Sequence, residues 1–301
     1  MKITVDTTAS KQRLDVFLTK HLGETRSQVK KLIEHGAVLV NGKTTTVHNF
    51  LKAGDLVEIN RDESVKNQSV TLDLPILARG NGYLIIDKPS GLLVHPTPSS
   101  NEPTVVDWLI KQVPTAAAVG DKRRPGIVHR LDKNTSGCLI LATTATAHAY
   151  FKRLFHDRQV KKTYTALVHG HLPLLQGEIN KPIGRSQKGA RMAARVQKIS
   201  DKDRDAITQY EVLKSYHDYD LIQASPLTGR THQIRVHLMS MGTPIVGDKI
   251  YTIHGQKKIE RLSRLFLHAQ SLSFVDMDGK NIQVNSPLPE KLQLFLNQLP
   301  L

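Results

Sequence analysis

The order in which strand-like and helical patterns follow one another limits what this chain can fold into more than any other feature. Short apolar runs typical of strands lie at residues 83 to 86, 138 to 142, 163 to 168, 221 to 224 and 272 to 275. Helical patterns are fewer and lie near residues 104 to 112, 145 to 157 and 231 to 241. A doubly wound parallel sheet needs regular alternation of the two, so this order predicts an α+β fold with a mixed, mainly antiparallel sheet.

Residues 1 to 60 have the pattern of a separate small αβ module. Ser10 precedes a stretch in which Leu14, Phe17, Leu18 and Leu22 recur at helical spacing, so a first helix is predicted after Ser10, with Gly23 as its end. A second helix begins at Thr25, which can form a capping box with Gln28, and ends at Gly36. A small antiparallel sheet then follows, built from residues 38 to 40, the Asn41-Gly42 turn, Val47 and residues 56 to 59.

The rest of the chain predicts a linker and one larger domain. Residues 61 to 72 are largely polar and lack periodicity, which is typical of a linker. Residues 73 to 301 hold the α+β pattern. A chain of 301 residues with 39% apolar content is long enough for two domains and a buried core.

The charge balance favours a polyanionic partner. The chain has 42 basic and 27 acidic residues, a net charge of +15, which suits nucleic acid better than a small neutral metabolite. Each Lys or Arg that neutralises a phosphate releases condensed counterions. The predicted helices of the first module place several such side chains on their solvent face: Lys11, Arg13, Lys20, Arg26, Lys30 and Lys31. An ordinary solvated helix face and a basic surface that serves only solubility are the alternatives.

Other compositional features exclude several classes of protein. Cys138 is the only cysteine and lies in an apolar run, so neither a disulfide framework nor a cysteine zinc site is expected, and a reducing cytoplasm fits. The N-terminus lacks the apolar core of a signal peptide, and no apolar run approaches membrane-spanning length. No dinucleotide fingerprint, P-loop or metal-ligand motif is present, so no cofactor or metal is expected.

Residues 129 to 137, His-Arg-Leu-Asp-Lys-Asn-Thr-Ser-Gly, crowd an anion, two cations and several hydrogen-bonding groups before a glycine. Apolar residues on both sides anchor this polar run as a loop. Asp132 is the candidate centre of chemistry. The alternative is a solvated turn in which Asp132 caps a helix or pairs with Arg130.

Two further segments could complete a site around Asp132. Residues 161 to 168 form a basic start to a strand whose alternation puts Tyr164, Ala166 and Val168 on one face. In residues 228 to 237, His232 and Arg235 fall on nearby helical positions, and Gly229 permits a sharp turn before them. Core packing of Tyr164 and a phosphate-binding surface patch around Arg235 are the alternatives.

Together these segments closely resemble the RNA pseudouridine synthases, in particular the subfamily that modifies large-subunit ribosomal RNA and carries an S4-like RNA-binding domain in front. His129 to Asp132 with Thr135 to Gly137 resembles the family's catalytic motif, Lys162 to Tyr164 its tyrosine motif, and Gly229 to His237 its arginine motif. The first module resembles the S4-like domain through its two helices, Val-Leu-Val-Asn-Gly and Ala-Gly-Asp. Three smaller matches also fit, at residues 87 to 89, 94 to 96 and 247 to 248. The resemblance covers almost the whole chain and is loosest from about residue 186 to 221.

The resemblance implies an isomerase that turns uridine in RNA into pseudouridine, with Asp132 as catalytic residue and Tyr164 and Arg235 completing the active site. The reaction exchanges an N1–C1′ bond for a C5–C1′ bond and needs no group donor. A carboxylate can add covalently to sugar or base, and the guanidinium of Arg235 is expected to supply paired donors that keep it ionised. The tyrosine ring can stack on a flipped base, and its hydroxyl could help to remove the C5 proton.

The residues expected to contact RNA are Arg130, Lys162, Arg230 and His232 near the site, and Lys11, Arg13, Arg26, Lys30 and Lys31 in the first module. Residues 181 to 204 hold eight basic and two acidic side chains and form either an arm that orders on RNA or a solvated loop. Large-subunit ribosomal RNA is the favoured partner and transfer RNA stays open. No obligate protein partner is implied, and a monomer is the default.

Rival functions come from other classes. His129 to Asp132 superficially resembles a kinase catalytic loop, but its Asp is one position late and no Gly-rich phosphate loop is present. A phosphorylated-aspartate pump would need membrane spans. The serious alternative is a catalytically silent RNA-binding or ribosome-assembly protein that keeps this fold.

Overall fold

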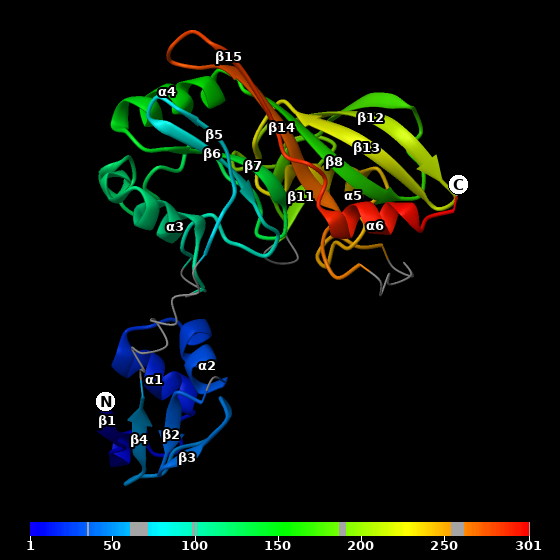
Figure 1. The fold of residues 1–301 in the computed structure, drawn as a ribbon. Helices are drawn as coiled ribbons and strands as arrows, with labels where there is room; N and C mark the ends of the chain where they lie inside the picture. Colours follow the sequence, from blue (N-terminus) through cyan, green and yellow to red (C-terminus); the bar gives the residue numbers. More distant parts are fainter. Residues whose placement is uncertain are drawn as a thin grey trace. The chain divides into compact units, whose positions relative to one another are not determined.

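The computed structural model describes residues 1 to 34, 36 to 60, 72 to 97, 100, 102 to 186, 191 to 253 and 262 to 300, apart from the side chains of Ser27 and Lys31. The chain divides into two compact units, Met1–Leu72 with Thr97–Asn101, and Asp73–Pro96 with Glu102–Leu301 (Figure 1). The linker predicted at residues 61 to 72 lies outside the described residues except for Leu72. In the described part of the chain, no helix is both long and apolar enough to cross a bilayer.

The first unit, blue in Figure 1, contains two helices and a four-stranded antiparallel sheet in the order β1-β4-β2-β3. Its elements are β1 (Lys2–Thr4), α1 (Leu14–Leu22), α2 (Arg26–Glu34), β2 (Val38–Val40), β3 (Lys43–Thr44) and β4 (Leu56–Ile59). Both predicted helices are confirmed, although α1 begins only at Leu14, so Lys11 and Arg13 precede it and do not lie on its face. Gly23 ends α1 in the left-handed conformation at φ 65°, which costs glycine nothing. Before α2, the Thr25 N–H donates to Gln28 Oε1 at 2.9 Å, and the Gln28 N–H donates back to Thr25 Oγ1 at 3.4 Å.

Two details of this unit differ from the sequence prediction. Strand β1, which pairs with β4, was not predicted, because three residues with only one partly buried position carry no readable alternation. Val47 lies outside the strands, in a turn after β3.

The second unit is built on a nine-stranded sheet. Eight strands follow the order β5-β6-β7-β14-β8-β13-β12-β9, and β15 pairs with β14. All of these pairings are antiparallel except that of β7 with β14, so the predicted mixed, mainly antiparallel sheet is confirmed. The strands are β5 (Ile76–Gly80), β6 (Tyr83–Lys88), β7 (Ser136–Ala142), β8 (Lys161–His169), β9 (Gln176–Asn180), β12 (Ile207–Tyr216), β13 (Tyr219–Pro226), β14 (Leu267–Val275) and β15 (Asn281–Asn285).

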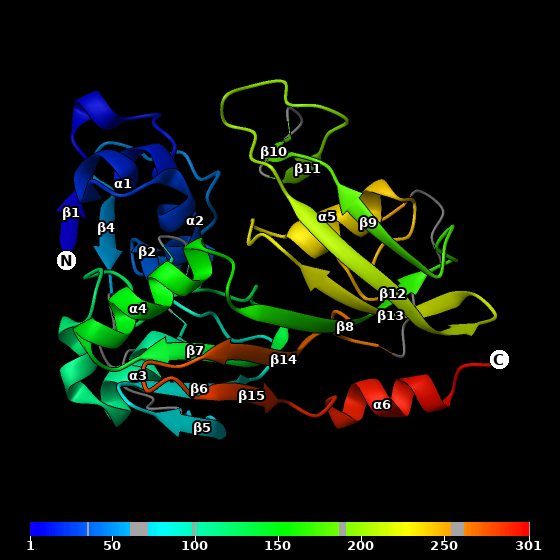
Figure 2. The ribbon, with the colours of Figure 1, turned by 90° about the horizontal axis from the view of Figure 1, so that it is seen from above.

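Helices cover different parts of this sheet. They are α3 (Val105–Gln112), α4 (Ala145–His156), α5 (Gln233–Ser240) and α6 (Glu290–Asn297). The helices predicted near residues 104 to 112, 145 to 157 and 231 to 241 are confirmed, although α5 begins only at Gln233. Figure 2 shows α4 beside β7, and α5 beside β12 and β13.

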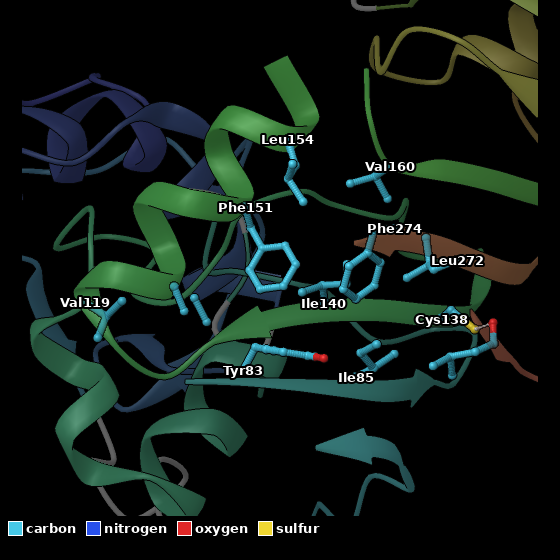
Figure 3. Close-up of a cluster of buried hydrophobic side chains, with 13 residues drawn as sticks. Tyr83, Ile85, Val119, Cys138, Ile140, Phe151, Leu154, Val160, Leu272 and Phe274 are labelled. Atoms are coloured by element: carbon cyan, nitrogen blue, oxygen red, sulfur yellow. Dashed lines mark hydrogen bonds between the residues drawn. The ribbon is translucent and has the colours of Figure 1, made fainter. Parts of the chain in front are cut away.

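The core beneath α4 is aromatic. Figure 3 shows Phe151 reaching from α4 toward Tyr83 of β6 and Phe274 of β14, over Ile140 of β7. The ring of Phe151 lies 5.0 Å from that of Tyr83 and 5.3 Å from that of Phe274, both edge to face, an arrangement that aromatic quadrupoles favour. This packing fixes β6, β7 and β14 relative to one another.

Strands β7 and β14, which lie next to each other in the middle of the sheet order, pair over only two residues of each strand. The loop that precedes β7 therefore lies near the middle of the sheet. Ser136 pairs with His268, and Gly137 with Ala269. Gly137 has φ 113°, and a Cβ at this position would lie 2.2 Å from the Ala269 carbonyl oxygen. The close approach therefore requires glycine, and residues 129 to 135 reach the sheet centre just ahead of it.

Residues 181 to 204 are partly an ordered hairpin. Strands β10 (Ile183–Arg185) and β11 (Met192–Ala194) pair antiparallel, and residues 187 to 190 lie outside the described part of the chain. Ile183 packs with Val236 of α5 and with Tyr251 in one buried cluster. The hairpin is therefore attached to the helix that carries Arg235.

Candidate active site

The loop before β7 is held from behind by a buried lysine. Lys88 Nζ donates to the carbonyl oxygens of Pro89, Leu92 and Lys133 at 2.8, 2.9 and 3.1 Å. Its side chain is fully buried, and burial lowers the pKa of Lys88 to about 7. Because Lys133 directly follows Asp132, these hydrogen bonds fix the position of the Asp132 backbone.

His129 supports the same loop as a neutral side chain. Its Nε2 accepts the Ile140 N–H at 2.9 Å, and its ring stacks on Phe155 at 4.4 Å between centroids. Burial lowers the pKa of His129 to about 3. His129 is therefore part of the framework between the loop, β7 and α4.

Asp132 and Arg235 meet although 103 residues separate them in sequence. Arg235 Nη1 donates to Asp132 Oδ2 at 3.1 Å. The other side of the guanidinium is bound by Asp248, whose two oxygens accept from Nε at 2.7 Å and from Nη2 at 2.9 Å. The ring of Tyr251 packs against Arg235, with 5.0 Å between its centroid and Cζ.

Asp248 is the most deeply buried side chain of this cluster and accepts the most hydrogen bonds. Its side chain is completely buried, and its Oδ1 also accepts the N–H groups of Ile250 at 2.8 Å and Tyr251 at 3.1 Å. Burial lowers the pKa of Arg235, but the hydrogen bonds and charge of Asp248, followed by those of Asp132, raise it above its ordinary value. Arg235 is therefore a permanent cation beside Asp132.

Tyr164 and His232 lie at the same place. Tyr164 comes from β8 and is 9% exposed; burial, with a smaller contribution from the charge of Asp132, raises the pKa of its hydroxyl, which stays protonated. His232 Nε2 lies 3.9 Å from Asp132 Oδ2. The sequence prediction for this segment was wrong in one respect: His232 is not helical but precedes α5 in the left-handed conformation at φ 57°, so the sharp turn falls there and not at Gly229.

These side chains line a cavity of about 1030 Å³. Asp132, Tyr164 and Arg235 contribute to its wall, as do four residues expected to contact RNA: Arg130, Lys162, Arg230 and His232. Among the described residues, its lining includes seven Lys or Arg side chains and one acidic side chain, Asp132. The cavity therefore attracts anions, with one carboxylate at its wall.

The basic residues at the cavity differ in their contacts. Lys162 Nζ donates to the Thr228 carbonyl at 3.3 Å, and burial lowers the pKa of Lys162 to about 8. Arg230 Nε donates to the Asp205 carbonyl at 3.1 Å, and its side chain stays exposed. Arg130 is exposed at the rim.

The candidate RNA contacts of the first unit are partly engaged in ion pairs. Arg13 and Arg26 donate to the nearly buried carboxylate of Asp15 at 3.0 and 2.8 Å. Lys30 Nζ lies 3.5 Å from Glu34 Oε1. Lys11 is exposed, and the side chain of Lys31 lies outside the described residues. Arg26 keeps 59% of its side chain exposed, so its pairing does not remove it from the surface.

Sequence reasoning missed the functions of Lys88, Asp248 and Tyr251 in this site. Asp87 to Pro89 and Gly247-Asp248 were noted only as matches to a family pattern. The available signal was the type of residue: a lysine inside an apolar strand pattern and an aspartate after Gly247 both need partners once buried. Which partners they find depends on the tertiary fold.

Comparison with known proteins agrees with this geometry. A family model described as RNA pseudouridylate synthase matches residues 82–240, and a model of the S4 domain matches residues 12–57. An uncharacterised RNA pseudouridine synthase of Synechocystis is 37% identical over 95% of this chain and 89% of its own length. A protein of Xanthomonas campestris named ribosomal large subunit pseudouridine synthase D is 33% identical over 98% of this chain and 91% of its own length.

Solved structures agree as well. The human protein named RNA pseudouridylate synthase domain containing 4 superimposes with a TM-score of 0.60 at 26% identity, over 75% of this chain and 94% of that one. The chain therefore belongs to the RNA pseudouridine synthases, a family of isomerases, and carries an S4 RNA-binding domain at its N-terminal end.

Proposed function

We propose that this enzyme converts uridines of large-subunit ribosomal RNA to pseudouridine, with Asp132 as its nucleophile. The observation that carries the proposal is the place of the Asp132 carboxylate: at the wall of a basic cavity, bound by Arg235 and close to Tyr164. Among the described residues that line this cavity, Asp132 is the one acidic side chain, and a carboxylate is the group that the reaction needs.

In the proposed reaction, Asp132 attacks the flipped nucleotide, either at C1′ of the ribose or at the base. The N1–C1′ bond breaks, the uracil turns, and its C5 forms the new bond to C1′. The proton on C5 then leaves while N1 gains one, and the carboxylate is released unchanged. No atom other than exchangeable hydrogen enters or leaves.

Arg235 and Tyr164 have different parts in this scheme. Arg235 places a fixed positive charge beside the Asp132 carboxylate and donates one hydrogen bond to it. Tyr164 offers a ring on which the flipped uracil stacks. The raised pKa of its hydroxyl favours stacking over removal of the C5 proton, since a phenol becomes a strong base only when ionised.

RNA binding rests on two features. The cations at the cavity, including Arg130, Lys162 and Arg230, can hold the phosphates beside the flipped nucleotide. The S4 domain supplies a second RNA-binding surface on residues 12–57. The choice of large-subunit ribosomal RNA is supported by the name of the Xanthomonas relative.

Tritium release from RNA labelled at C5 of uridine tests the nucleophile. Asp132→Asn is nearly isosteric, so it is expected to abolish release while RNA still binds. Asp218→Asn changes an exposed carboxylate and serves as the control. Normal release by Asp132→Asn would show that Asp132 is not the nucleophile.

Two variants of Tyr164 separate its proposed roles. Tyr164→Phe keeps the ring and is expected to retain turnover, whereas Tyr164→Ala is expected to lose it. A Phe variant as inactive as the Ala variant would require the hydroxyl. The class of RNA is tested by mapping pseudouridines in cells with and without the gene, where loss confined to transfer RNA would contradict the ribosomal assignment.

A further inference from the structure

His232 is held in an unusual conformation at the edge of the catalytic cavity. Its φ of 57° lies in the left-handed region, which histidine adopts more readily than most side chains but still at a cost. The strained turn aims the imidazole into the cavity, where Nε2 lies 3.9 Å from Asp132 Oδ2. About a quarter of the side chain is exposed, so a bound nucleotide can reach it.

The hydrogen bonds behind the ring fix its tautomer. The Met192 N–H donates to the Tyr251 hydroxyl oxygen at 3.2 Å, and the same hydroxyl lies 2.9 Å from His232 Nδ1. Within the described residues, Nδ1 is the only acceptor that this hydroxyl proton has. Nδ1 therefore accepts, and in a neutral imidazole the remaining proton must be on Nε2.

That Nε2–H group faces the cavity without being used. A separation of 3.9 Å is too long for a hydrogen bond to Asp132, and no other acceptor for Nε2 is found among the described residues. Burial lowers the pKa of His232, and the cations Arg235 and Arg130 lower it further, against the charges of Asp132 and Asp248. The imidazole is thus neutral and does not compete with Arg235 as a counter-ion.

We propose that His232 is a further catalytic residue, whose Nε2–H donates a hydrogen bond to a carbonyl oxygen of the uracil while the base is detached from the ribose. The proposal rests on the proposed function of the site. When N1–C1′ breaks, the bonding electron pair stays on the uracil and spreads over N1, O2 and O4. A fixed donor at one of these oxygens stabilises that charge, as neutral imidazoles do for other developing oxyanions.

Neutrality matters to this role. An imidazolium beside Asp132 would pair with the carboxylate and make it a poorer nucleophile, whereas a neutral N–H donor stabilises the leaving base and leaves Asp132 to Arg235 alone. No proton is transferred by His232 in this step. Its contribution is made in the transition state and the detached intermediate, so it acts on kcat.

A matched pair of substitutions tests the donor. His232→Gln carries an amide N–H to nearly the position of Nε2, whereas the amide of His232→Asn ends near the level of Nδ1. Asparagine is the better residue for a left-handed backbone, so conformational strain alone favours the Asn variant. We expect His232→Asn to lose roughly 10²-fold in kcat and His232→Gln to keep about ten times more, with KM for RNA little changed in both. An Asn variant as active as the Gln variant would overturn the proposal.

Tyr251→Phe tests the tautomer while keeping the ring that packs on Arg235. Without the hydroxyl, His232 Nδ1 loses its hydrogen-bond donor, so Tyr251→Phe alone is expected to lower kcat by about tenfold. Added to His232→Asn, the same substitution is expected to lower kcat no further than His232→Asn does alone. Independent, multiplicative losses would mean that Tyr251 acts otherwise.

The outcomes also separate this inference from the proposed function. Suppose that the wild-type enzyme releases tritium, and that His232→Asn raises KM but leaves kcat unchanged. His232 would then be an RNA contact, as the sequence predicted. The proposal for His232 would fail, while the proposed function would stand. If wild-type enzyme and Asp132→Asn release tritium equally, the proposed function fails first. Thermal unfolding of each variant shows whether it is folded under assay conditions.

Discussion

Substitution of Asp248 by Asn tests whether Arg235 is positioned by a buried partner. Asp248 Oδ1 accepts from Arg235 Nη2 and from the N–H groups of Ile250 and Tyr251. Among the described residues, Arg235 Nε is the only donor to Oδ2. In Asp248→Asn the amide oxygen can keep the contacts of Oδ1. The amide NH₂ then faces Arg235 Nε–H, donor against donor.

The size of the effect follows from burial. The Asp248 side chain is fully buried and that of Arg235 is 7% exposed, so solvent does not screen the pair. Removing one partner of such a pair costs about 3–5 kcal/mol, and the retained acceptor places the Asp248→Asn variant near the lower end, about 3 kcal/mol of unfolding free energy. A displacement of the guanidinium by about 1 Å from Asp132 is expected to lower kcat by roughly 10²-fold.

Asp220→Asn is the matched control. Asp220 is also buried, at 2% exposure, and accepts from Ser215 Oγ at 2.7 Å and from the Leu172 N–H at 2.8 Å. It does not line the catalytic cavity. Tritium release and thermal unfolding should show both variants less stable but only Asp248→Asn slow at a temperature where both are folded. Equal turnover of the two variants would refute a positioning role for Asp248.

Three further outcomes are expected. Gly137→Ala should lower the unfolding free energy by about 3 kcal/mol or more, measured by denaturant unfolding, because its Cβ would meet the Ala269 carbonyl at 2.2 Å. The hydrogen bond to Asp220 raises the pKa of His171, so its stabilisation is present below the ordinary value of 6.5 and is lost as pH rises through the raised pKa. The stability difference between wild type and His171→Gln should shrink over that window, and a constant difference would contradict it. Arg158 is one of the seven basic residues that line the cavity, so Arg158→Gln should reduce the salt dependence of RNA binding by about one phosphate contact, seen in the slope of log Kd against log salt.

Much of the site could be predicted because its residues lie in local patterns. The loop around Asp132 is a polar run between apolar anchors, and Gly137 punctuates its end. The helix end at Gly23 and the Thr25–Gln28 capping box could also be predicted, because each depends on residues that are close in sequence. Pairing of Asp132 with Arg235 was expected from the need of a carboxylate for a counter-ion, and the structure brings the two together.

What could not be predicted depends on contacts between distant segments. The paired donors of Arg235 were expected to bind Asp132, but the structure gives them to Asp248, 13 residues away. Sequence alone does not tell which of two carboxylates they meet. The left-handed turn at His232 was assigned to Gly229 because glycine is the usual residue for it. The tertiary contact of the His232 ring, a hydrogen bond with the Tyr251 hydroxyl, involves a residue 19 positions away and could not be read from the local sequence.

The division of Arg235 between two carboxylates has a chemical consequence. Had Asp132 received both paired donors, its charge would be spread over two strong hydrogen bonds, and both oxygens would be occupied. Asp248 takes that pair, and Asp132 receives one bond, on Oδ2. Among the described residues, none donates a hydrogen bond to Asp132 Oδ1. In the proposed mechanism, Oδ1 is therefore the attacking oxygen, and Asp248, by binding Nε and Nη2 of Arg235, keeps those donors from occupying it.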